Sequence, residues 1–337
     1  MTNTRITYDN TQLSPPNQQP AALHDDQLVR DLRQPNARTP QITTSVDTYL
    51  RASGAENTRR AYRSDVEHFL RWGAQIPASP ETVAEYIAHH AEQLSPFTLA
   101  RRLVALAQAH KFAEFENPCS SQLVKATIRG IRRVRGLAQR QADPILREDL
   151  LLMLDLLPNS TRGIRDRALL LVGFCGAFRR GEIAAMRFDD VRFVPEGLTI
   201  CLPRSKTDQE GKGRLIAIPW GRSKACAVRS LKAWIDHAGI GSGAIFRRIN
   251  KGGKVLSDRV CGSSVAQIIK EHAACAGLNV EKISGHSLRA GLVTSAAKSG
   301  VSSWKIRQQT GHKSDAMLER YIRDSDLFNN NAASAVL

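Results

Sequence analysis

The sequence predicts a mainly helical protein in two parts, with one small antiparallel β-sheet in the second part. Apolar residues recur at the spacing of amphipathic helices through residues 41–135, and again in several segments after residue 146. Two runs, 198–202 and 214–218, instead alternate in the manner of β-strands, and the Gly- and Lys-containing stretch between them predicts a hairpin. A chain of 337 residues is long enough for two domains, each with a sizeable core.

The charge balance indicates a polyanionic partner. Lys and Arg number 48 against 32 Asp and Glu, a formal net charge of +16, and nucleic acid is the partner that such an excess favours. An anionic membrane surface is the alternative. The sequence shows neither a signal peptide nor an apolar run of about 18 residues, so we expect no membrane association.

The cysteines and the absence of phosphate-binding motifs from the sequence limit the chemistry. The six cysteines are scattered without C-x-x-C spacing, which is typical of reduced thiols in the cytoplasm rather than of disulfides or a zinc site. The sequence has no Gly-rich phosphate loop and no carboxylate cluster. We therefore expect no cofactor, neither ATP nor a catalytic metal.

The first part begins with an arm and continues as a set of helices. Residues 1–40 are polar and rich in Pro, Gln, Asn and Thr, which predicts a mostly disordered arm. Residues 41–135 predict five helices: one at 42–52, one from an Asn57-Thr58 cap, one after Ser79-Pro80, one after Ser95-Pro96 and one at 121–135. Residues 136–145 predict a linker, because Asp143-Pro144 disfavours helix at the junction.

Basic side chains accompany these helices. Arg59, Arg60 and Arg63 fall on the polar side of the second helix, and Arg101 and Arg102 are expected to be exposed on the fourth. A single such arginine is more often merely solvated. Several helices share the bias, however, and this favours contact with the phosphates of DNA.

The second part also predicts helices before its last third, at 147–157, 161–174, 223–237 and 257–276. Ser257-Asp258 is expected to cap the last of them, which would place Arg259 in its first turn. An arginine there could enter the major groove of DNA and read a base.

Four polar side chains arrive on successive short elements near the end of the chain. His286 and Arg289 are three residues apart in a helical segment, so both can reach one ligand. His312 follows a break at Thr310-Gly311, and Tyr321 comes nine residues later. Arginine matches phosphate oxygens, histidine moves protons near neutral pH, and tyrosine is a nucleophile where a positive site stabilises its phenolate. The set indicates phosphoryl transfer to tyrosine; the alternative is a basic helical domain in which these side chains merely occupy surface or core.

These motifs resemble the tyrosine recombinase, or phage integrase, family. The chain has H-x-x-R at 286–289, G-H at 311–312 and tyrosine nine residues after that histidine, and E-R-Y-I-R at 319–323 resembles Cre-like members in particular. The resemblance covers residues 41–337. It implies a helical core-binding (SAM-like) domain at 41–135 and an α+β catalytic domain at 146–326, closing as a C-shaped clamp around double-stranded DNA.

The resemblance also assigns residues in the middle of the chain. In the run 176–186 the family register selects Arg179 as catalytic, with Glu182 as its supporting partner, over the rival Arg180. On a helix Arg180 would project about 100° away from Arg179, so both could not point into one pocket. R-S-K-T at 204–207 matches the hairpin lysine of the family and selects Lys206 over Lys212.

By this resemblance the protein is a site-specific DNA recombinase that needs neither metal nor ATP. Tyr321 would attack a DNA phosphodiester, giving a 3′-phosphotyrosyl intermediate and, after strand exchange, a Holliday junction. The other roles would be divided as follows: Arg179 and Arg289 hold the non-bridging oxygens, His312 donates a hydrogen bond, His286 assists proton removal from Tyr321, and Lys206 protonates the leaving 5′ oxygen.

The resemblance further implies a homotetramer on two inverted-repeat sites, with a helix at 327–337 of each protomer docked on its neighbour. The expected setting is the cytoplasm and nucleoid of a bacterial, archaeal or phage-infected cell, where the reaction serves DNA integration, excision or resolution. Two alternatives stay open: a DNA-binding regulator on the same fold, and a related enzyme that relaxes supercoils or closes hairpin telomeres. The reaction products distinguish them.

Overall fold

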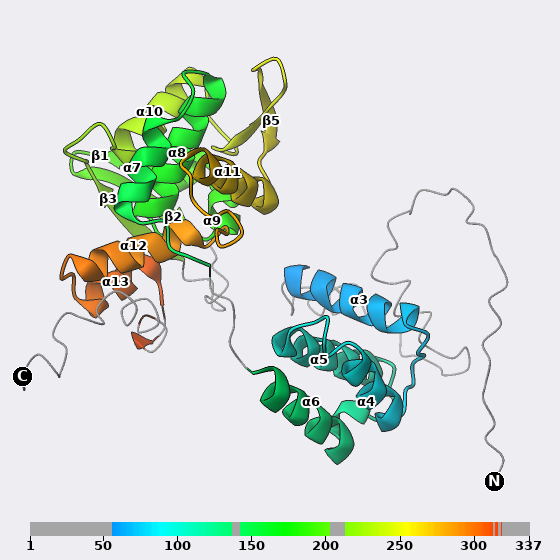
Figure 1. The fold of residues 1–337 in the computed structure, drawn as a ribbon. Helices are drawn as coiled ribbons and strands as arrows, with labels where there is room; N and C mark the ends of the chain where they lie inside the picture. The colour runs from blue at the N-terminus through cyan, green and yellow to red at the C-terminus, as the bar shows by residue number, and fades with distance from the viewer. Residues whose placement is uncertain (1–55, 137–141, 203–212, 313, 316–317, 319–337) are drawn as a thin grey trace, which may run out of the picture. The chain divides into compact units, whose positions relative to one another are not determined.

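The computed structural model describes residues 56–136, 142–202, 213–312, 314–315 and 318. The chain forms two compact units that divide between residues 139 and 140 (Figure 1). The expected arm at 1–40, the first expected helix at 42–52 and the helix at 327–337 lie outside the described residues, as do Lys206, Lys212 and Tyr321. Within the described ranges, no helix is long and apolar enough to cross a lipid bilayer.

The described part of the N-terminal unit consists of four α-helices around one apolar core (Figure 1). They are α3 (Glu56–Arg71), α4 (Pro80–His89), α5 (Pro96–Phe112) and α6 (Gln122–Arg135), with a short 3₁₀ turn at Pro118–Ser120 before α6. The side chains of Phe69, Tyr86, Leu99, Leu106 and Val124 are fully buried between them.

Serine caps fix where three of these helices begin. In each, the serine Oγ accepts a hydrogen bond at 3.2 Å from the backbone N–H three residues later: Ser79 from Thr82, Ser95 from Thr98 and Ser121 from Val124. A cap of this kind contributes about 1 kcal/mol to helix stability. The predicted starts of these three helices are confirmed, whereas α3 begins at Glu56, slightly before the predicted Asn57-Thr58 cap.

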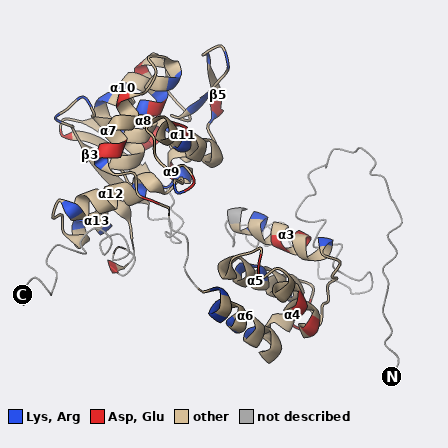
Figure 2. Ribbon diagram, viewed as in Figure 1, with Lys and Arg blue, Asp and Glu red and all other residues tan. Residues whose placement is uncertain are grey.

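Basic residues gather on α6, where Figure 2 shows them along the helix. The apolar side of α6 buries Val124 and Ile128. The remaining faces expose five basic side chains: Lys125, Arg129, Arg132, Arg133 and Arg135. This surface is the most basic helix face in the described part of the N-terminal unit, and it carries the kind of charge that phosphate contact requires.

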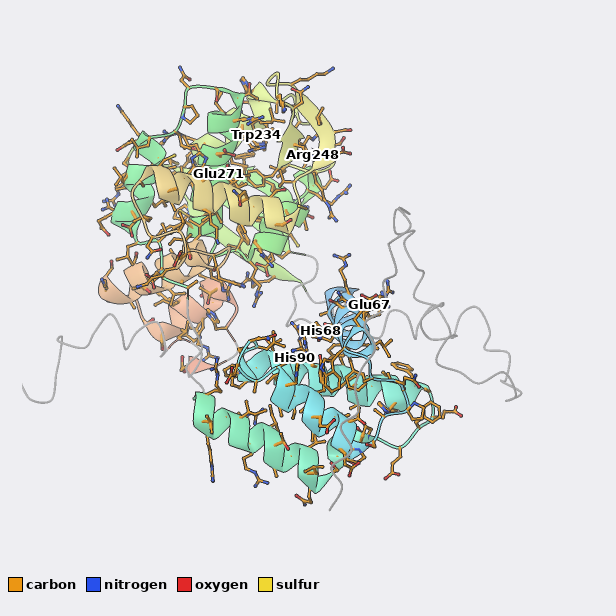
Figure 3. The ribbon with its side chains drawn as sticks, turned by 45° about the vertical axis from the view of Figure 1, so that its right-hand side comes forward. Glu67, His68, His90, Trp234, Arg248 and Glu271 are labelled. Carbon is orange, nitrogen blue, oxygen red and sulfur yellow. The ribbon has the colours of Figure 1, made fainter. Side chains whose placement is uncertain are left out.

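The C-terminal unit combines helices with two small antiparallel sheets. Its elements are α7 (Arg147–Asp155), α8 (Thr161–Cys175), α9 (Arg180–Ala185), β1 (Val191–Val194), β2 (Gly197–Leu202), β3 (Arg214–Pro219), α10 (Ala227–His237), β4 (Arg247–Ile249), β5 (Val255–Arg259), α11 (Gly262–Cys275), α12 (Ser287–Lys298) and α13 (Ser303–Thr310). The largely buried α8 packs against α10 and α12. Trp234 of α10 (Figure 3) is fully buried in this core and donates from Nε1 to the carbonyl oxygen of Ile245 at 2.9 Å.

Alternation of apolar residues sets the three-stranded sheet, in which β2 lies between β1 and β3 and both pairs are antiparallel. Ile200 at the centre pairs with Val191 on one side and with Ile216 on the other. Leu198, Ile200 and Leu202 are buried while Cys201 is exposed. The predicted antiparallel pairing of these two strands is confirmed, and the predicted hairpin tip lies outside the described residues. The strand β1 was not predicted, because four residues are too few to show an alternation.

A second two-stranded ribbon replaces the expected start of the helix at 257–276. β4 pairs antiparallel with β5, and Arg259 lies opposite Arg247. Cys261, not Ser257, caps α11, with its Sγ accepting from the N–H of Ser264 at 3.4 Å. The predicted place of Arg259 in the first turn of a helix is therefore wrong, because pairing with β4 takes up the backbone that a longer helix would have used. Likewise, α10 begins at residue 227 and not at 223.

Candidate active site

Arg179 and Glu182 form a closely hydrogen-bonded pair at the start of α9. The backbone N–H of Arg179 donates to Oε2 of Glu182 at 2.8 Å, and its Nη1 donates to Oε1 at 2.6 Å. A charge-assisted hydrogen bond of this kind is short and strong, and it holds the guanidinium against the carboxylate. Glu182 is therefore the partner of Arg179, as expected. That the two residues take part in catalysis stays a prediction.

Arg180 lies closer to this region than the helix argument allowed. Arg179 is the cap residue before α9 and lacks helical geometry, so the expected separation of about 100° does not apply. The stem of Arg180 lies against Gly285, where an added Cβ would come within 2.7 Å of its Cδ. Its charge also helps to lower the pKa of His286. The argument that Arg180 must point away from the site is therefore wrong. Arg179 stays the expected catalytic residue, because its guanidinium is the one that Glu182 holds.

Arg289 on α12 is buried beside the turn between α8 and α9. Its Nη1 donates to the carbonyl oxygen of Ala177 at 2.7 Å, and its Nη2 lies 3.2 Å from Nε2 of His312. Ala177 has a φ of 49°, a left-handed conformation that costs a residue with a side chain roughly 1–2 kcal/mol. The turn keeps this strained conformation with its carbonyl directed at a guanidinium, which is typical of a functional site.

His312 follows the left-handed glycine that ends α13, and its side chain is buried. Its Nδ1 lies 2.8 Å from Oγ1 of Thr310. Burial first, and then the charges of Arg289, Arg179 and Arg214, lower the pKa of His312 to about 4. The imidazole is therefore neutral at physiological pH, and its contact with Arg289 joins α13 to α12.

His286 occupies the cap position of α12, one helical turn before Arg289. Arg289 is buried, but the His286 side chain reaches solvent. Partial loss of water around the ring, followed by the charges of Arg180, Arg289 and Arg179, lowers the pKa of His286, while Glu182 raises it. A histidine with a lowered pKa keeps a lone pair near neutral pH and can accept a proton.

Arg214 at the start of β3 is a further guanidinium in this region, and the sequence reasoning missed it. Its Nη2 lies 3.8 Å from Oε2 of Glu182, and its Nη1 donates to the backbone carbonyl of Gln309 at 3.2 Å. Burial is the first cause that lowers the pKa of Arg214, with Glu182 opposing and Arg179 acting in the same direction. Residues 214, 216 and 218 share one face of the strand, and the two isoleucines among them are buried. An arginine that alternates with buried isoleucines on one face of a strand was the signal in the sequence that could have indicated a buried, functional Arg214.

Gln309 on α13 connects three segments near the site. Its Nε2 donates to the carbonyl oxygen of Cys175 at 2.9 Å and to that of Ala217 at 3.2 Å. Its own backbone carbonyl accepts from Arg214. The end of α8, the strand β3 and the helix α13 are therefore tied together beside the arginines.

The structure brings four of the residues expected at the site together as two contacting pairs, Arg179 with Glu182 and Arg289 with His312. The charge of Arg179 acts on His312, and the charges of Arg179, Arg289 and Glu182 act on a fifth expected residue, His286. Lys206 and Tyr321 lie outside the described residues, so their places here stay predictions. Three expected DNA contacts, Arg59, Arg60 and Arg63, lie on α3 in the other unit, and Arg259 is exposed on β5.

Arg101 and Arg102 on α5 have opposite surroundings. Arg101 is exposed over half of its side chain and donates from Nε and Nη2 to the Asp65 carboxylate, both at 2.8 Å. Arg102 is buried and donates from Nη1 to the hydroxyl of Tyr86 at 2.8 Å, with Nδ1 of His68 (Figure 3) at 2.9 Å. The prediction that Arg102 is exposed is wrong, because a position three residues after a core leucine falls on the buried face of the helix.

Comparison with known proteins identifies the family. The model of the phage integrase family matches residues 145–327, and that of the phage integrase N-terminal SAM-like domain matches residues 47–117. The chain is 38% identical over 315 residues to an integrase/recombinase xerD homolog from Selenomonas ruminantium, covering 90% of this chain and 92% of that protein.

Solved structures agree at the level of the fold. One is a lambda integrase dimer bound to a COC′ core site, with a TM-score of 0.58 and 19% identity, covering 82% of this chain and 76% of the other. Another is a lambda integrase tetramer bound to a Holliday junction, with a TM-score of 0.57 and 17% identity, covering 86% and 77%.

The fold and its relatives define a DNA-recombining enzyme, with a SAM-like helical unit followed by an integrase-type unit. The chain belongs to the phage integrase family and is a site-specific tyrosine recombinase. The fold class, the family and the recombinase function predicted from the sequence are confirmed.

Proposed function

We propose that this recombinase cleaves DNA by transferring a phosphodiester to Tyr321, with Arg179 and Arg289 holding the non-bridging oxygens. The observation that carries the proposal is the separate anchoring of the two guanidiniums. Glu182 holds the first, and the Ala177 carbonyl together with His312 holds the second. Cations fixed in advance in a partly dry site stabilise the charge of the transition state without rearranging.

Two further residues would move protons. His286, with its lowered pKa, takes the proton of Tyr321, and Lys206 gives one to the leaving 5′ oxygen. Lys206 falls in the connection between β2, which ends at Leu202, and β3, which begins at Arg214. Arg214, the first residue of β3, lies beside Glu182. This position supports the proposal that the connection before β3 brings Lys206 to the same site. The phosphotyrosyl link conserves the energy of the broken bond, so that ATP is not needed to rejoin the strands.

We also propose double-stranded DNA with an inverted-repeat site as the substrate, and a homotetramer on two such sites. The exposed arginines of α6, together with the exposed Arg60 and the half-buried Arg59 and Arg63 of α3, would supply phosphate contacts. The lambda integrase tetramer bound to a Holliday junction has a similar fold, which supports this assembly. The segment at 327–337 would dock on the neighbouring protomer, and the reaction would take place in the cytoplasm.

A nicked suicide substrate tests the chemistry directly, because the cleaved end diffuses away and the covalent protein–DNA adduct accumulates. Wild-type protein should form the adduct, and Tyr321→Phe should bind the same DNA with unchanged affinity while forming none. Covalent adducts formed by Tyr321→Phe would show that Tyr321 is not the nucleophile. Products from two-site circular DNA then separate recombination from supercoil relaxation and from hairpin formation.

A further inference from the structure

Thr310, the last residue of α13, is buried, and its hydroxyl makes two contacts. Oγ1 donates to the carbonyl oxygen of Ile306 at 2.7 Å and lies 2.8 Å from Nδ1 of His312. A hydroxyl has one proton to donate and lone pairs with which to accept. Because that proton is directed at a carbonyl, which can only accept, the hydroxyl acts as an acceptor toward His312. Nδ1 of His312 must then carry a hydrogen.

The other ring nitrogen leads to the same assignment independently. Nε2 of His312 lies 3.2 Å from Nη2 of Arg289, and a guanidinium can only donate hydrogen bonds. With the opposite tautomer or a charged ring, two N–H groups would face each other. Burial and the nearby arginines also keep the ring neutral by lowering the pKa of His312 to about 4. Nε2 therefore presents its lone pair to Arg289.

The backbone around the ring is held as well. The carbonyl oxygen of His312 accepts from Nε of Arg307 at 3.4 Å, and Nη1 of Arg307 donates to the Asp315 carboxylate at 3.1 Å. A flip of the imidazole would replace each ring nitrogen by a C–H group and lose the contacts with Thr310 and Arg289. The neutral Nδ1–H form in this orientation satisfies both the Thr310 hydroxyl and the Arg289 guanidinium.

We propose that Thr310 is a positioning residue that fixes His312 in its Nδ1–H form, so that His312 acts as the acceptor that orients Arg289. The inference rests on the proposed function, in which Arg289 holds a non-bridging oxygen of the phosphate. Nε2 of this form accepts from Arg289, so His312 contributes to the position of the guanidinium.

Nitrogen-15 spectroscopy of the histidine rings in the full chain tests the tautomer without any DNA. Protonated and unprotonated ring nitrogens differ in chemical shift, and the signals of His312 are identified by their loss in His312→Gln. Wild type and Thr310→Ser should both show a protonated Nδ1 and an unprotonated Nε2. Thr310→Val keeps the shape of the side chain and removes the hydroxyl, so the fixed Nδ1–H signature should be lost.

A wild-type His312 that is protonated at Nε2 overturns the proposal, as does a Thr310→Val spectrum with an unchanged Nδ1–H signature. The wild-type and Thr310→Ser spectra decide the tautomer even where Thr310→Val fails to fold. Cleavage of the suicide substrate provides the second readout. Thr310→Val should cleave roughly ten- to a hundredfold more slowly than wild type, the scale on which small misplacements act, and Thr310→Ser should recover the rate.

The two proposals fail in different ways. If wild-type protein forms no covalent adduct, the proposed chemistry fails and the spectra still report the tautomer. If adducts form and Thr310→Val cleaves as fast as wild type, the chemistry stands and Thr310 has no positioning role.

Discussion

Glu182 and Arg214 lie 3.8 Å apart across the site, and the same carboxylate holds Arg179 at 2.6 Å. One anion is therefore shared by a predicted catalytic guanidinium and by a guanidinium on the strand that leaves the hairpin. Two cations held this close repel each other unless an anion lies between them. The carboxylate thus sets the distance between two segments of the C-terminal unit.

Glu182→Gln should slow cleavage of the suicide substrate by roughly tenfold to a hundredfold with little change in DNA affinity, because a misplaced guanidinium costs on this scale. Glu182 also raises the pKa of His286, so its loss should move the acid limb of the pH–rate profile to lower pH. Single-turnover rates across the pH range measure both effects. Glu196→Gln, an exposed change, is the matched control. An unchanged profile in Glu182→Gln would contradict the link to His286.

Arg214→Met should also impair cleavage, because the methionine fills the buried stem but leaves Glu182 and the Gln309 carbonyl without the guanidinium. Thermal unfolding monitored in parallel separates a folding defect from a catalytic one. Arg192→Met, an exposed change on β1 of the same sheet, should leave the cleavage rate unaltered. Equal rates for the two variants would show that Arg214 is only a structural residue.

The free energy of unfolding should fall as the pH is lowered from about 6.5 toward about 4, partly because of His312. In the unfolded chain the His312 ring is protonated near its ordinary pKa of about 6.5, whereas in the folded protein its pKa is about 4. Stability is therefore fully present above that window and is lost within it, by at most about 1.4 kcal/mol per pH unit. Urea unfolding of wild type and His312→Gln isolates this contribution, since the two proteins differ only at this side chain. If the difference in the free energy of unfolding between the two proteins is the same at pH 6.5 and at pH 4, His312 is not a buried neutral ring.

Lys206, and not Lys212, should donate the proton to the leaving oxygen. Lys206→Ala should cleave ordinary DNA poorly and recover on a substrate with a bridging 5′ sulfur, because a thiolate leaves without protonation. Lys212→Ala should cleave both substrates at nearly the wild-type rate. Failure of the sulfur substrate to rescue Lys206→Ala, or an equal defect in Lys212→Ala, would remove the assignment.

Arg102 and Arg129 should separate stability from DNA contact. Arg102→Ala leaves the buried hydroxyl of Tyr86 without its donor, so it should destabilise the protein by about 1–3 kcal/mol. Arg129→Ala on the exposed face of α6 should leave stability nearly unchanged, weaken DNA binding uniformly across sequences and reduce the salt dependence by about one ion. Unfolding curves and binding titrations at several salt concentrations measure both. A loss of stability in Arg129→Ala would show that Arg129 has a structural role and is not only a DNA contact.

Helix starts were predictable where one local signal decides them. Ser79-Pro80 and Ser95-Pro96 place a cap and a first-turn proline side by side, and both helices begin there. Residues 257–259 carry a similar cap-like pair, yet they form a strand because β4 offers them a partner. A local pattern cannot report a partner that comes from another segment.

The same limit applies to the site. Residue type and spacing were enough to single out Arg289 and His312, and the resemblance to the family selected Arg179. The fold then brings the three near one another. Arg214 escaped because its contact with Gln309 joins residues that are 95 positions apart. The tautomer of His312 depends on distances of a few tenths of an ångström around one hydroxyl, and no sequence pattern encodes those.

Gln309 and Arg214 together fasten α13 to β3. The helix α13 leads toward Tyr321, and β3 leads out of the connection that holds Lys206. Any shift of α13 against β3 must break these hydrogen bonds or draw the strand along with it. The helix that precedes the proposed nucleophile and the strand that follows the proposed proton donor therefore move as one body as long as those bonds hold.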